Sequence, residues 1–173
     1  SLTQKDVKQT GHSIECRIYA EDPSRNFLPT PGFVRKLELP VGPGIRNDVG
    51  ILEGQEVSSS YDPLLSKLVV WDSNRADAIN RMNYALGNFV VLGLITNQPF
   101  LKEIISNKEF VKGNFDTNFI SENFADWKLD DIPLEAIASA LLSSKSSSTT
   151  IVSKDPKDIS SPWNQKGHWR QGL

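Results

Sequence analysis

The residue with the clearest chemical potential is Arg46, which lies in the stretch GPGIRNDVG at positions 42–50. Glycine and proline are too frequent here for a regular element, so we expect a loop, with Asp48 following two residues later. A guanidinium is always charged and has donors in fixed directions, so it can stabilise a developing negative charge better than lysine can. A simply solvated turn arginine is the alternative, and composition alone favours it.

Arg17 is a second cation to consider. It alternates with Cys16 and Ile18 in a pattern typical of a half-buried strand. It could lie near the same site as Arg46. The alternation favours a structural role instead, either on the solvent face or in an ion pair with Glu15 or Glu21.

Three further groups are better explained by structure than by chemistry. Asp62 precedes Pro63, and an aspartate in that position more often fixes a turn than acts as a base. Lys67 is expected to point off the sheet, and Cys16 to be a small buried hydrophobe.

The sequence contains no complete active site of a common kind. The GPG at 42–44 lacks the phosphate-loop pattern, and no G-x-G-x-x-G stands between a strand and a helix. No serine elbow or cysteine–histidine pair stands out, and His12 and His168 are too far apart to suggest a metal site. We therefore expect an accessory domain that contributes one or two groups to a site built elsewhere.

The composition is that of a soluble globular protein. The 173 residues are 38% hydrophobic and 23% charged, with a net charge of -2. This balance, without a basic stripe, argues against nucleic acid as a partner. The longest apolar run, FVVLGLI at 89–95, is far shorter than the roughly 18 residues of a membrane span, so no membrane partner is expected. The single cysteine favours a reducing compartment.

The amino-terminal stretch SLTQKDVKQTGHS has neither the apolar core of a signal peptide nor the arginine-rich character of a transit peptide. It also lacks an initiating methionine. We therefore expect an internal piece of a longer chain, from which a targeting segment could have been lost.

Alternation with a period of two predicts a mostly antiparallel sheet in the first 71 residues. The predicted strands are 14–20, 33–39 and 64–71. Between them we expect a structured loop at 22–32, a turn with a short extended piece at 42–50, and a hairpin around Glu53 and Gly54 within 51–60. A short polar helix is expected before Gly11.

The period then changes to that of helices. In DSNRADAINRMNYALGNF, apolar residues recur at helical spacing, and Ser73 or Asn74 can cap the start. Further helices are predicted over 97–107, 117–124 and 133–144. The stretch SSKSSSTT reads as a linker, and the tail with Trp163 and Trp169 is expected to dock elsewhere or to begin another domain.

Six motifs together resemble a known family. GHSIECRIYAEDP, FLPTPG, GPGIRNDVG, YDPLLSKLVVW, NRADAINRM and TNQPFLKEI are similar, in this order and spacing, to the carboxy-terminal domain of biotin carboxylase. The resemblance covers residues 1–124 and implies an α+β fold, with an antiparallel sheet like a barrel-sandwich hybrid followed by packed helices. Residues 125–173 resemble the junction in long acyl-CoA carboxylase subunits of the methylcrotonyl-, propionyl- or acetyl-CoA carboxylase type.

The resemblance implies a ligase reaction in which ATP, Mg²⁺ and bicarbonate yield carbon dioxide, which the ureido nitrogen of biotin accepts. The family's G-P-G-V-R pattern aligns its arginine with Arg46 and implies that Arg46 is catalytic and biotin-binding. A fixed donor beside the ureido oxygen is typically worth about 3 to 4 kcal/mol. The ATP-grasp region and the biotin-lysine motif are absent from the sequence, so we expect a fragment that is inactive alone.

The resemblance also implies partners: the remaining biotin carboxylase region, a biotin carrier domain and a carboxyltransferase subunit. Trp71 and Arg75 lie at a strand-to-helix corner where bacterial members form a dimer, and a dimer contact is an alternative here to simple packing within the chain. The implied location is the cytoplasm, or the mitochondrial matrix in a eukaryote. Two rivals stay open: a non-catalytic docking module, and an independent small-ligand-binding domain.

Overall fold

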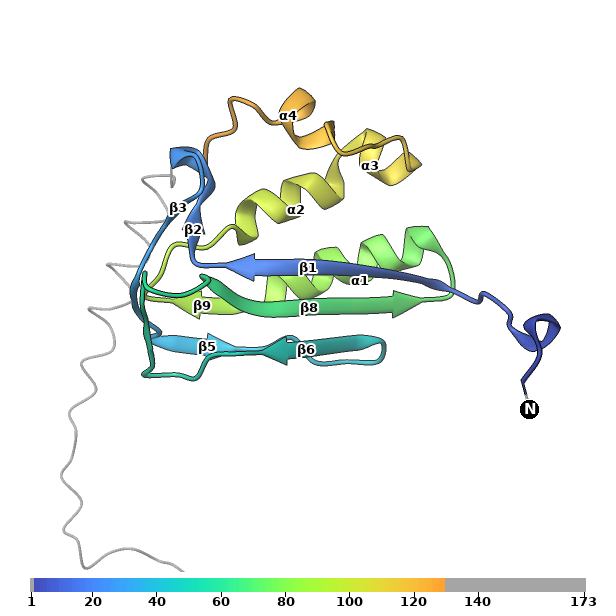
Figure 1. Ribbon diagram of the computed structural model, residues 1–173, viewed down its shortest axis with the longest axis horizontal. Helices are drawn as coiled ribbons and strands as arrows, with labels where there is room; N and C mark the ends of the chain where they lie inside the picture. The colour runs from blue at the N-terminus through green and yellow to red at the C-terminus, as the bar shows by residue number, and fades with distance from the viewer. Residues whose placement is uncertain (1, 130–173) are drawn as a thin grey trace, which may run out of the picture. The chain divides into compact units, whose positions relative to one another are not determined.

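The computed structural model describes residues 2–129, which contain a three-stranded antiparallel sheet (Figure 1). The strands β1 (His12–Tyr19) and β6 (Ile45–Val49) both pair with β8 (Leu64–Asp72), so the strand order is β1-β8-β6. Cys16 lies opposite Leu68 on one side, and Asn47 lies opposite Leu68 on the other. Residues far apart in the sequence therefore meet across the central strand β8.

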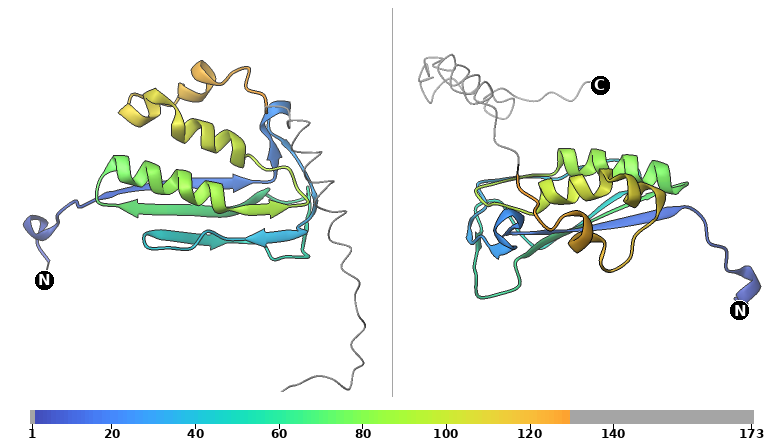
Figure 2. Two further views of the ribbon diagram at one scale, coloured as in Figure 1. Left: turned by 180° about the vertical axis from the view of Figure 1, so that it is seen from behind. Right: turned by 90° about the horizontal axis from the view of Figure 1, so that it is seen from above.

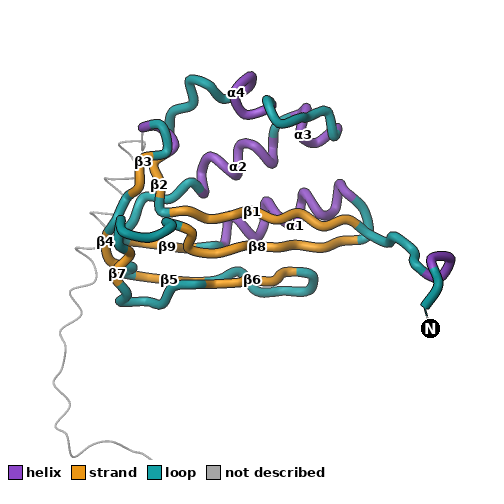
Figure 3. The backbone as a smooth tube through the Cα atoms, viewed as in Figure 1, coloured by secondary structure: helices purple, strands orange, loops and turns teal. Residues whose placement is uncertain are grey.

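Three short antiparallel ladders tie down the loops between these strands. They pair β2 (Glu21–Asp22) with β3 (Leu28–Pro29), β4 (Gly32–Phe33) with β7 (Glu56–Val57), and β5 (Lys36–Glu38) with β9 (Val90–Leu92). Figure 3 shows β4 and β7 near the end of the sheet where β1 finishes.

The helices follow the sheet in the chain. They are α1 (Arg75–Asn88), α2 (Gln98–Ser106), α3 (Lys108–Lys112) and α4 (Phe119–Asn123), with two 3₁₀ turns, η1 (Gln4–Asp6) and η2 (Pro23–Arg25). Helix α1 lies behind β1 and β8 in Figure 1 and in front of them in the reverse view of Figure 2, with α2 beside it. The Asn74 side chain caps α1 by accepting a hydrogen bond from the Asp77 N–H.

The main core lies between the sheet and α1. Alternate residues of β1 and β8 point into it, and α1 contributes an apolar stripe at helical spacing. Burying one large apolar side chain of this kind contributes about 1.5–3 kcal/mol. The fully buried side chains include Ile18, Leu65, Leu68, Val70, Met82, Leu86 and Phe89.

A second, aromatic cluster surrounds Phe100 of α2. The rings of Phe124 and Trp127 meet Phe100 edge to face, with centroid separations of 5.5 and 5.2 Å. Edge-to-face pairs add to the energy of burial. The packed region therefore continues through Trp127.

The structure confirms the α+β class and the predicted strands at 14–20 and 64–71, as well as helices at 73–89, 97–107 and 117–124. The predicted helix at 133–144 and the linker lie outside the described residues. Helix α3 was not predicted, and the helix expected before Gly11 is only the 3₁₀ turn η1. The narrower barrel-sandwich description stays a prediction.

The predicted hairpin around Glu53 and Gly54 is wrong. Gly54 does turn the chain, with φ of +84°, but β7 pairs with β4 and not with the segment before the turn. The backbone of Val34 exchanges hydrogen bonds with Gly54 and Gln55, and the Val57 side chain is buried in the core. These same contacts interrupt the single strand predicted at 33–39, which is divided into β4 and β5.

Candidate functional site

The sheet face turned away from α1, here called the open face, carries five charged side chains. They are Glu15 and Arg17 on β1, Lys67 on β8, and Arg46 and Asp48 on β6. Their neighbours in each strand are the residues that point into the core, because successive side chains alternate across a sheet. The open face is the candidate site.

Arg46 is the second residue of β6, so the turn with a short extended piece predicted at 42–50 is confirmed, whereas the loop expected at Arg46 itself is wrong. It lies opposite Val69 of β8, and its side chain is 69% exposed. Its Nη2 donates to Asp48 Oδ2 at 3.1 Å. An exposed pair of this kind contributes about 0–1 kcal/mol, so the guanidinium can exchange Asp48 for another anion at little cost.

The glycine-rich turn before Arg46 is held by the end of β8. The Trp71 N–H donates to the Gly44 carbonyl at 2.8 Å, and the Ile45 N–H donates to the Gly42 carbonyl at 3.2 Å. Gly44 has φ of +69°, and a Cβ there would collide with the Trp71 carbonyl oxygen. Glycine is therefore required where the turn enters β6.

Arg17 forms the ion pair that the sequence offered as one alternative, through Nε to Glu15 Oε1 at 3.0 Å. That hydrogen bond, together with the negative charge of Glu15, raises the pKa of Arg17. In the register Arg17 lies opposite Lys67, and Asp48 lies opposite Lys67 on the far side. Two cations directly opposite each other are unfavourable for a sheet, so this part of the open face is suited to an anion.

Two expectations about structural residues are confirmed. The Asp62 carboxylate accepts the Leu64 N–H at 2.8 Å and so fixes the turn before β8. Cys16 is 4% exposed. Burial, with the charge of Glu15 adding to it, raises the pKa of the Cys16 thiol to about 12, which makes this thiol unreactive at neutral pH.

Trp71 and Arg75 differ in what they offer a partner. Trp71 is 51% exposed at the end of β8. Arg75 is used within the chain: it bonds His12 Nε2 at 3.0 Å, donates to the Phe110 carbonyl, and lies over the Phe110 ring at 4.9 Å. The proposed dimer contact stays a prediction, with Trp71 as the available side chain.

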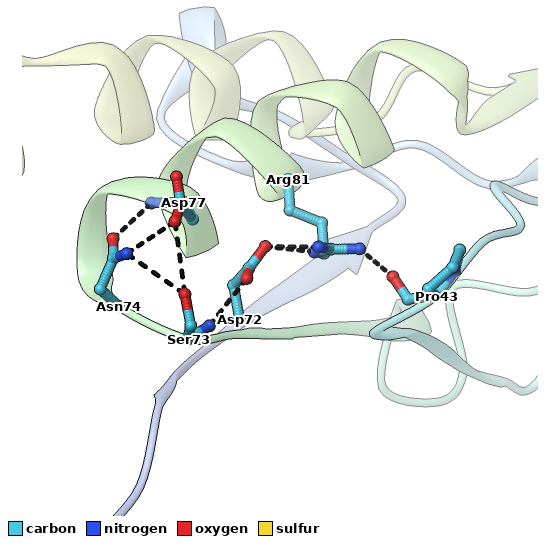
Figure 4. A network of polar contacts seen from close by, with 6 residues as sticks. All are labelled: Pro43, Asp72, Ser73, Asn74, Asp77 and Arg81. Carbon is cyan, nitrogen blue, oxygen red and sulfur yellow. Dashed lines mark hydrogen bonds and ion pairs between the residues drawn. The ribbon is translucent and has the colours of Figure 1, made fainter.

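The sequence reasoning missed a bridge between β8, α1 and the turn before Arg46 (Figure 4). Arg81 donates through Nε to Asp72 Oδ2 at 2.8 Å, donates through Nη2 to the same oxygen, and donates through Nη1 to the Pro43 carbonyl. The Ser73 N–H and then Arg81 lower the pKa of Asp72. The sequence did contain one indication of this bridge. Arg81 lies next to Met82 on the predicted helix that follows Asp72, where a cation could pair with that aspartate.

Within residues 2–129, no set of three or more histidine, cysteine or acidic residues is arranged to hold a metal ion. No helix in that range combines the length and apolar character of a membrane span. The open face offers the exposed guanidinium groups of Arg17 and Arg46, which can donate hydrogen bonds to a negatively charged group.

The comparisons with known proteins agree with the α+β fold. The family model described as the biotin carboxylase C-terminal domain matches residues 15–122. The chain belongs to this family.

Two relatives illustrate the sequence similarity. The mitochondrial propionyl-CoA carboxylase alpha chain of Mus musculus is 45% identical over 125 residues, which is 71% of this chain and 17% of the mouse protein. The mitochondrial methylcrotonoyl-CoA carboxylase subunit alpha of Arabidopsis thaliana is 36% identical over 168 residues, which is 96% of this chain and 23% of the plant protein. This chain thus spans less than a quarter of either relative.

Solved structures show the same fold. The biotin carboxylase domain dimer of Hydrogenobacter thermophilus 2-oxoglutarate carboxylase, in complex with MgADP, ADP and bicarbonate, superposes with a TM-score of 0.72 at 35% identity, over 75% of this chain and 29% of that one. A complete multifunctional pyruvate carboxylase from Rhizobium etli gives a TM-score of 0.70 at 35% identity, over 75% of this chain and 13% of that one.

Proposed function

We propose that this chain is the carboxy-terminal part of a biotin carboxylase and that its open face supplies a guanidinium to the site of biotin carboxylation. The observation that carries the proposal is the gathering of exposed cations on a sheet whose other face is a packed core. The relatives named as acyl-CoA carboxylase alpha chains, and the related domain bound to MgADP and bicarbonate, support this class of reaction.

Arg46 is the first candidate for the catalytic and biotin-binding guanidinium. The reaction carboxylates the ureido nitrogen of biotin, and negative charge develops on the ureido oxygen. A fixed donor at such an oxygen is worth about 3 to 4 kcal/mol. Among residues 2–129, Asp48 is the hydrogen-bond partner of Arg46, and it engages only Nη2. The remaining donors of the guanidinium can face a substrate.

Arg17 is a second candidate, favoured by the strand register. It lies opposite Lys67, whereas Arg46 lies opposite the uncharged Val69. An anion bound between Arg17 and Lys67 would offset their repulsion, so the pair is suited to binding a negatively charged group. Both arginines are more than 60% exposed in the side chain, so either can reach a ligand above the open face.

Of the groups used in this reaction, the described residues are suited to biotin but not to ATP or Mg²⁺. The guanidinium donors of the open face fit an oxygen that carries negative charge, as the ureido oxygen of biotin does during carboxylation. The same residues hold no cluster of ligands suited to Mg²⁺ and no phosphate loop. We therefore assign ATP and Mg²⁺ to an ATP-grasp region of the same enzyme, without which this chain would be inactive.

The wider assembly is part of the proposal. Its partners would be the ATP-grasp region, a biotin carrier domain and a carboxyltransferase subunit, with a homodimer formed through Trp71 as a further arrangement. The domain would span residues 1–124, followed by a junction at 125–173 of the methylcrotonyl- or propionyl-CoA carboxylase type. The compartment would be the cytoplasm, or the mitochondrial matrix in a eukaryote.

The test replaces each guanidinium in the full-length protein that contains this chain. Arg46→Ala and Arg17→Ala are compared in ATP- and bicarbonate-dependent carboxylation of free biotin. Loss of the catalytic donor is expected to lower kcat by about 10²–10³-fold. The variant with the larger loss identifies the residue that faces the ureido oxygen.

Arg35→Ala is the matched control, because Arg35 is exposed and lies outside β1, β8 and β6. All three variants should keep the melting temperature of the parent within a few degrees, since exposed pairs contribute little to stability. Normal carboxylation by both Arg46→Ala and Arg17→Ala would sink the catalytic proposal.

The rival is a docking module in which the arginines are incidental. The half-exposed Trp71 favours it, because exposed aromatic residues are enriched at interfaces. Under this rival, Trp71→Ala would weaken self-association or subunit binding measured by analytical ultracentrifugation. Both arginine variants would then carboxylate biotin normally.

A further inference from the structure

The turn Gly42–Pro43–Gly44 leads directly into β6, two residues before Arg46, which lies opposite Val69 of β8. Its backbone is held by one hydrogen bond from β8, between the Trp71 N–H and the Gly44 carbonyl. The turn has no apolar side chain in the main core, and Val41 before it is 79% exposed. Packing alone therefore gives this turn little support, and polar contacts must fix it.

Arg81 provides that support from α1. Its guanidinium engages Asp72 with Nε and Nη2 and reaches the Pro43 carbonyl with Nη1, so one side chain joins α1, the end of β8 and the turn (Figure 4). The second oxygen of Asp72 accepts the Ser73 N–H at 2.7 Å, which fixes the carboxylate. The three hydrogen bonds of Arg81, to Asp72 and Pro43, form what we call the Arg81 clamp.

The Arg81 clamp is more sheltered than the ion pairs of the open face. Its side chains are 28% and 19% exposed, against 69% and 40% for Arg46 and Asp48. Sheltered, charge-assisted hydrogen bonds are stronger than exposed ones. A planar guanidinium can serve two acceptors in fixed directions, which a lysine ammonium on a flexible stem does poorly.

We propose that Arg81 is a positioning residue that fixes the Gly42–Pro43–Gly44 turn and, through it, the placement of Arg46 on the open face. The catalytic part of this inference rests on the proposed function of Arg46. The structural part, that the clamp immobilises the turn, does not. Because Arg81 points to the turn and not to the open face, its effect on chemistry must pass through Arg46.

The experiment uses the full-length protein with Arg81→Ala, Arg81→Lys, Arg46→Ala and the double variant Arg46→Ala/Arg81→Ala. Amide hydrogen exchange is read at Ile45 and Trp71, whose N–H groups donate to the Gly42 and Gly44 carbonyls. Arg81→Ala should speed exchange at both amides by about tenfold or more, with Arg81→Lys intermediate. It should lower kcat and kcat/KM for biotin carboxylation by a similar factor.

The double variant separates positioning from general stabilisation. If Arg81 acts through Arg46, Arg81→Ala causes no further loss of carboxylation once Arg46 is alanine. Arg25→Ala is the matched control, since Arg25 makes the same kind of Nε–carboxylate pair with Asp22 at 2.8 Å but does not bond the turn. It should leave exchange at Ile45 and Trp71 unchanged.

Three results would overturn one proposal or the other. Unchanged exchange at Ile45 and Trp71 in Arg81→Ala overturns the clamp, whatever the activity. Independent, additive losses in the double variant overturn the positioning role while leaving Arg46 catalytic. Normal carboxylation by Arg46→Ala overturns the catalytic assignment of Arg46 and with it the catalytic role of the clamp, whose hold on the turn is then judged by exchange alone.

Discussion

The two faces of the β1-β8-β6 sheet are built from the same strands and do different work. On the covered face, Leu68 and Val70 are fully buried in the core that includes α1. On the open face, Arg17 and Arg46 each form an exposed ion pair. Lys67 forms no ion pair with the residues that the structure describes. Adjacent residues of β8 therefore face the core and the candidate site in turn.

This difference separates residues that stabilise the fold from those of the candidate site within single strands. The covered face gains most of its energy from apolar burial, which grows with the area removed from water. The open face gains little from its charge pairs, because water and salt screen them. Substitutions on the open face can therefore change its chemistry while the covered face keeps the fold stable.

The largest expected effect compares neighbours on β8. Leu68→Ala should lower the free energy of unfolding by about 2–5 kcal/mol, because it opens a cavity at a fully buried position. Lys67→Ala should change it by less than about 0.5 kcal/mol, as surface substitutions usually do. Both are measured by urea unfolding of the full-length protein. Equal losses in the two variants would show that the faces do not differ as described.

A smaller effect is expected where the edge strand β6 begins. Gly44→Ala should cost at least about 1–3 kcal/mol, because alanine is strained at positive φ and its Cβ would meet the Trp71 carbonyl. Gly54→Ala separates the two causes, since Gly54 also has positive φ but open space around its Cβ position. Thermal unfolding should therefore show the greater loss for Gly44→Ala. The same loss in both variants would mean that the Trp71 contact is unimportant.

The smallest effect concerns a carboxylate sheltered at a strand end and not on the open face. The Ser24 hydroxyl, the strongest influence, and the nearby Arg25 lower the pKa of Asp22 below its usual 3.8. An aspartate with a lowered folded pKa adds stability that is fully present above pH about 4 and is lost as the pH falls through the folded pKa. The stability difference between the parent and Asp22→Asn should therefore shrink below pH 4.

Ser24→Ala supplies the control for this pH dependence, because it removes the hydroxyl that most lowers the pKa of Asp22. Its own stability curve should lose less on acidification than that of the parent. A gap between parent and Asp22→Asn that stays constant from pH 7 to pH 3 would contradict the role given to Asp22.

Sequence periodicity predicted the elements that are long and regularly patterned. Alternation around Cys16 and Ile18 indicated β1, and apolar residues at helical spacing indicated α1. Periodicity failed for Glu53 and Gly54, because the hydrogen bonds of that segment go to Val34, a partner distant in sequence. Local patterns can indicate that a turn exists, but not which strand lies beside it.

The site was predicted in part for the same reason. The stretch around Arg46 predicted a turn with a short extended piece, but not that this piece would pair with β8 as the strand β6. Arg17 and Lys67 lie opposite each other only because of the register between β1 and β8, which are far apart in the sequence. The Arg81 clamp depends on α1 folding back against the turn. Neither arrangement leaves a local signature in the sequence.

The strand order described above places β1 and β6 at the two edges of the three-stranded sheet. Exposed sheet edges invite pairing with other chains, and charged side chains discourage it. We therefore expect Glu15 and Arg17 on one edge strand, with Arg46 and Asp48 on the other, to discourage such pairing. Replacing these charges with apolar residues would therefore be expected to make the sheet edges more prone to pair with other chains.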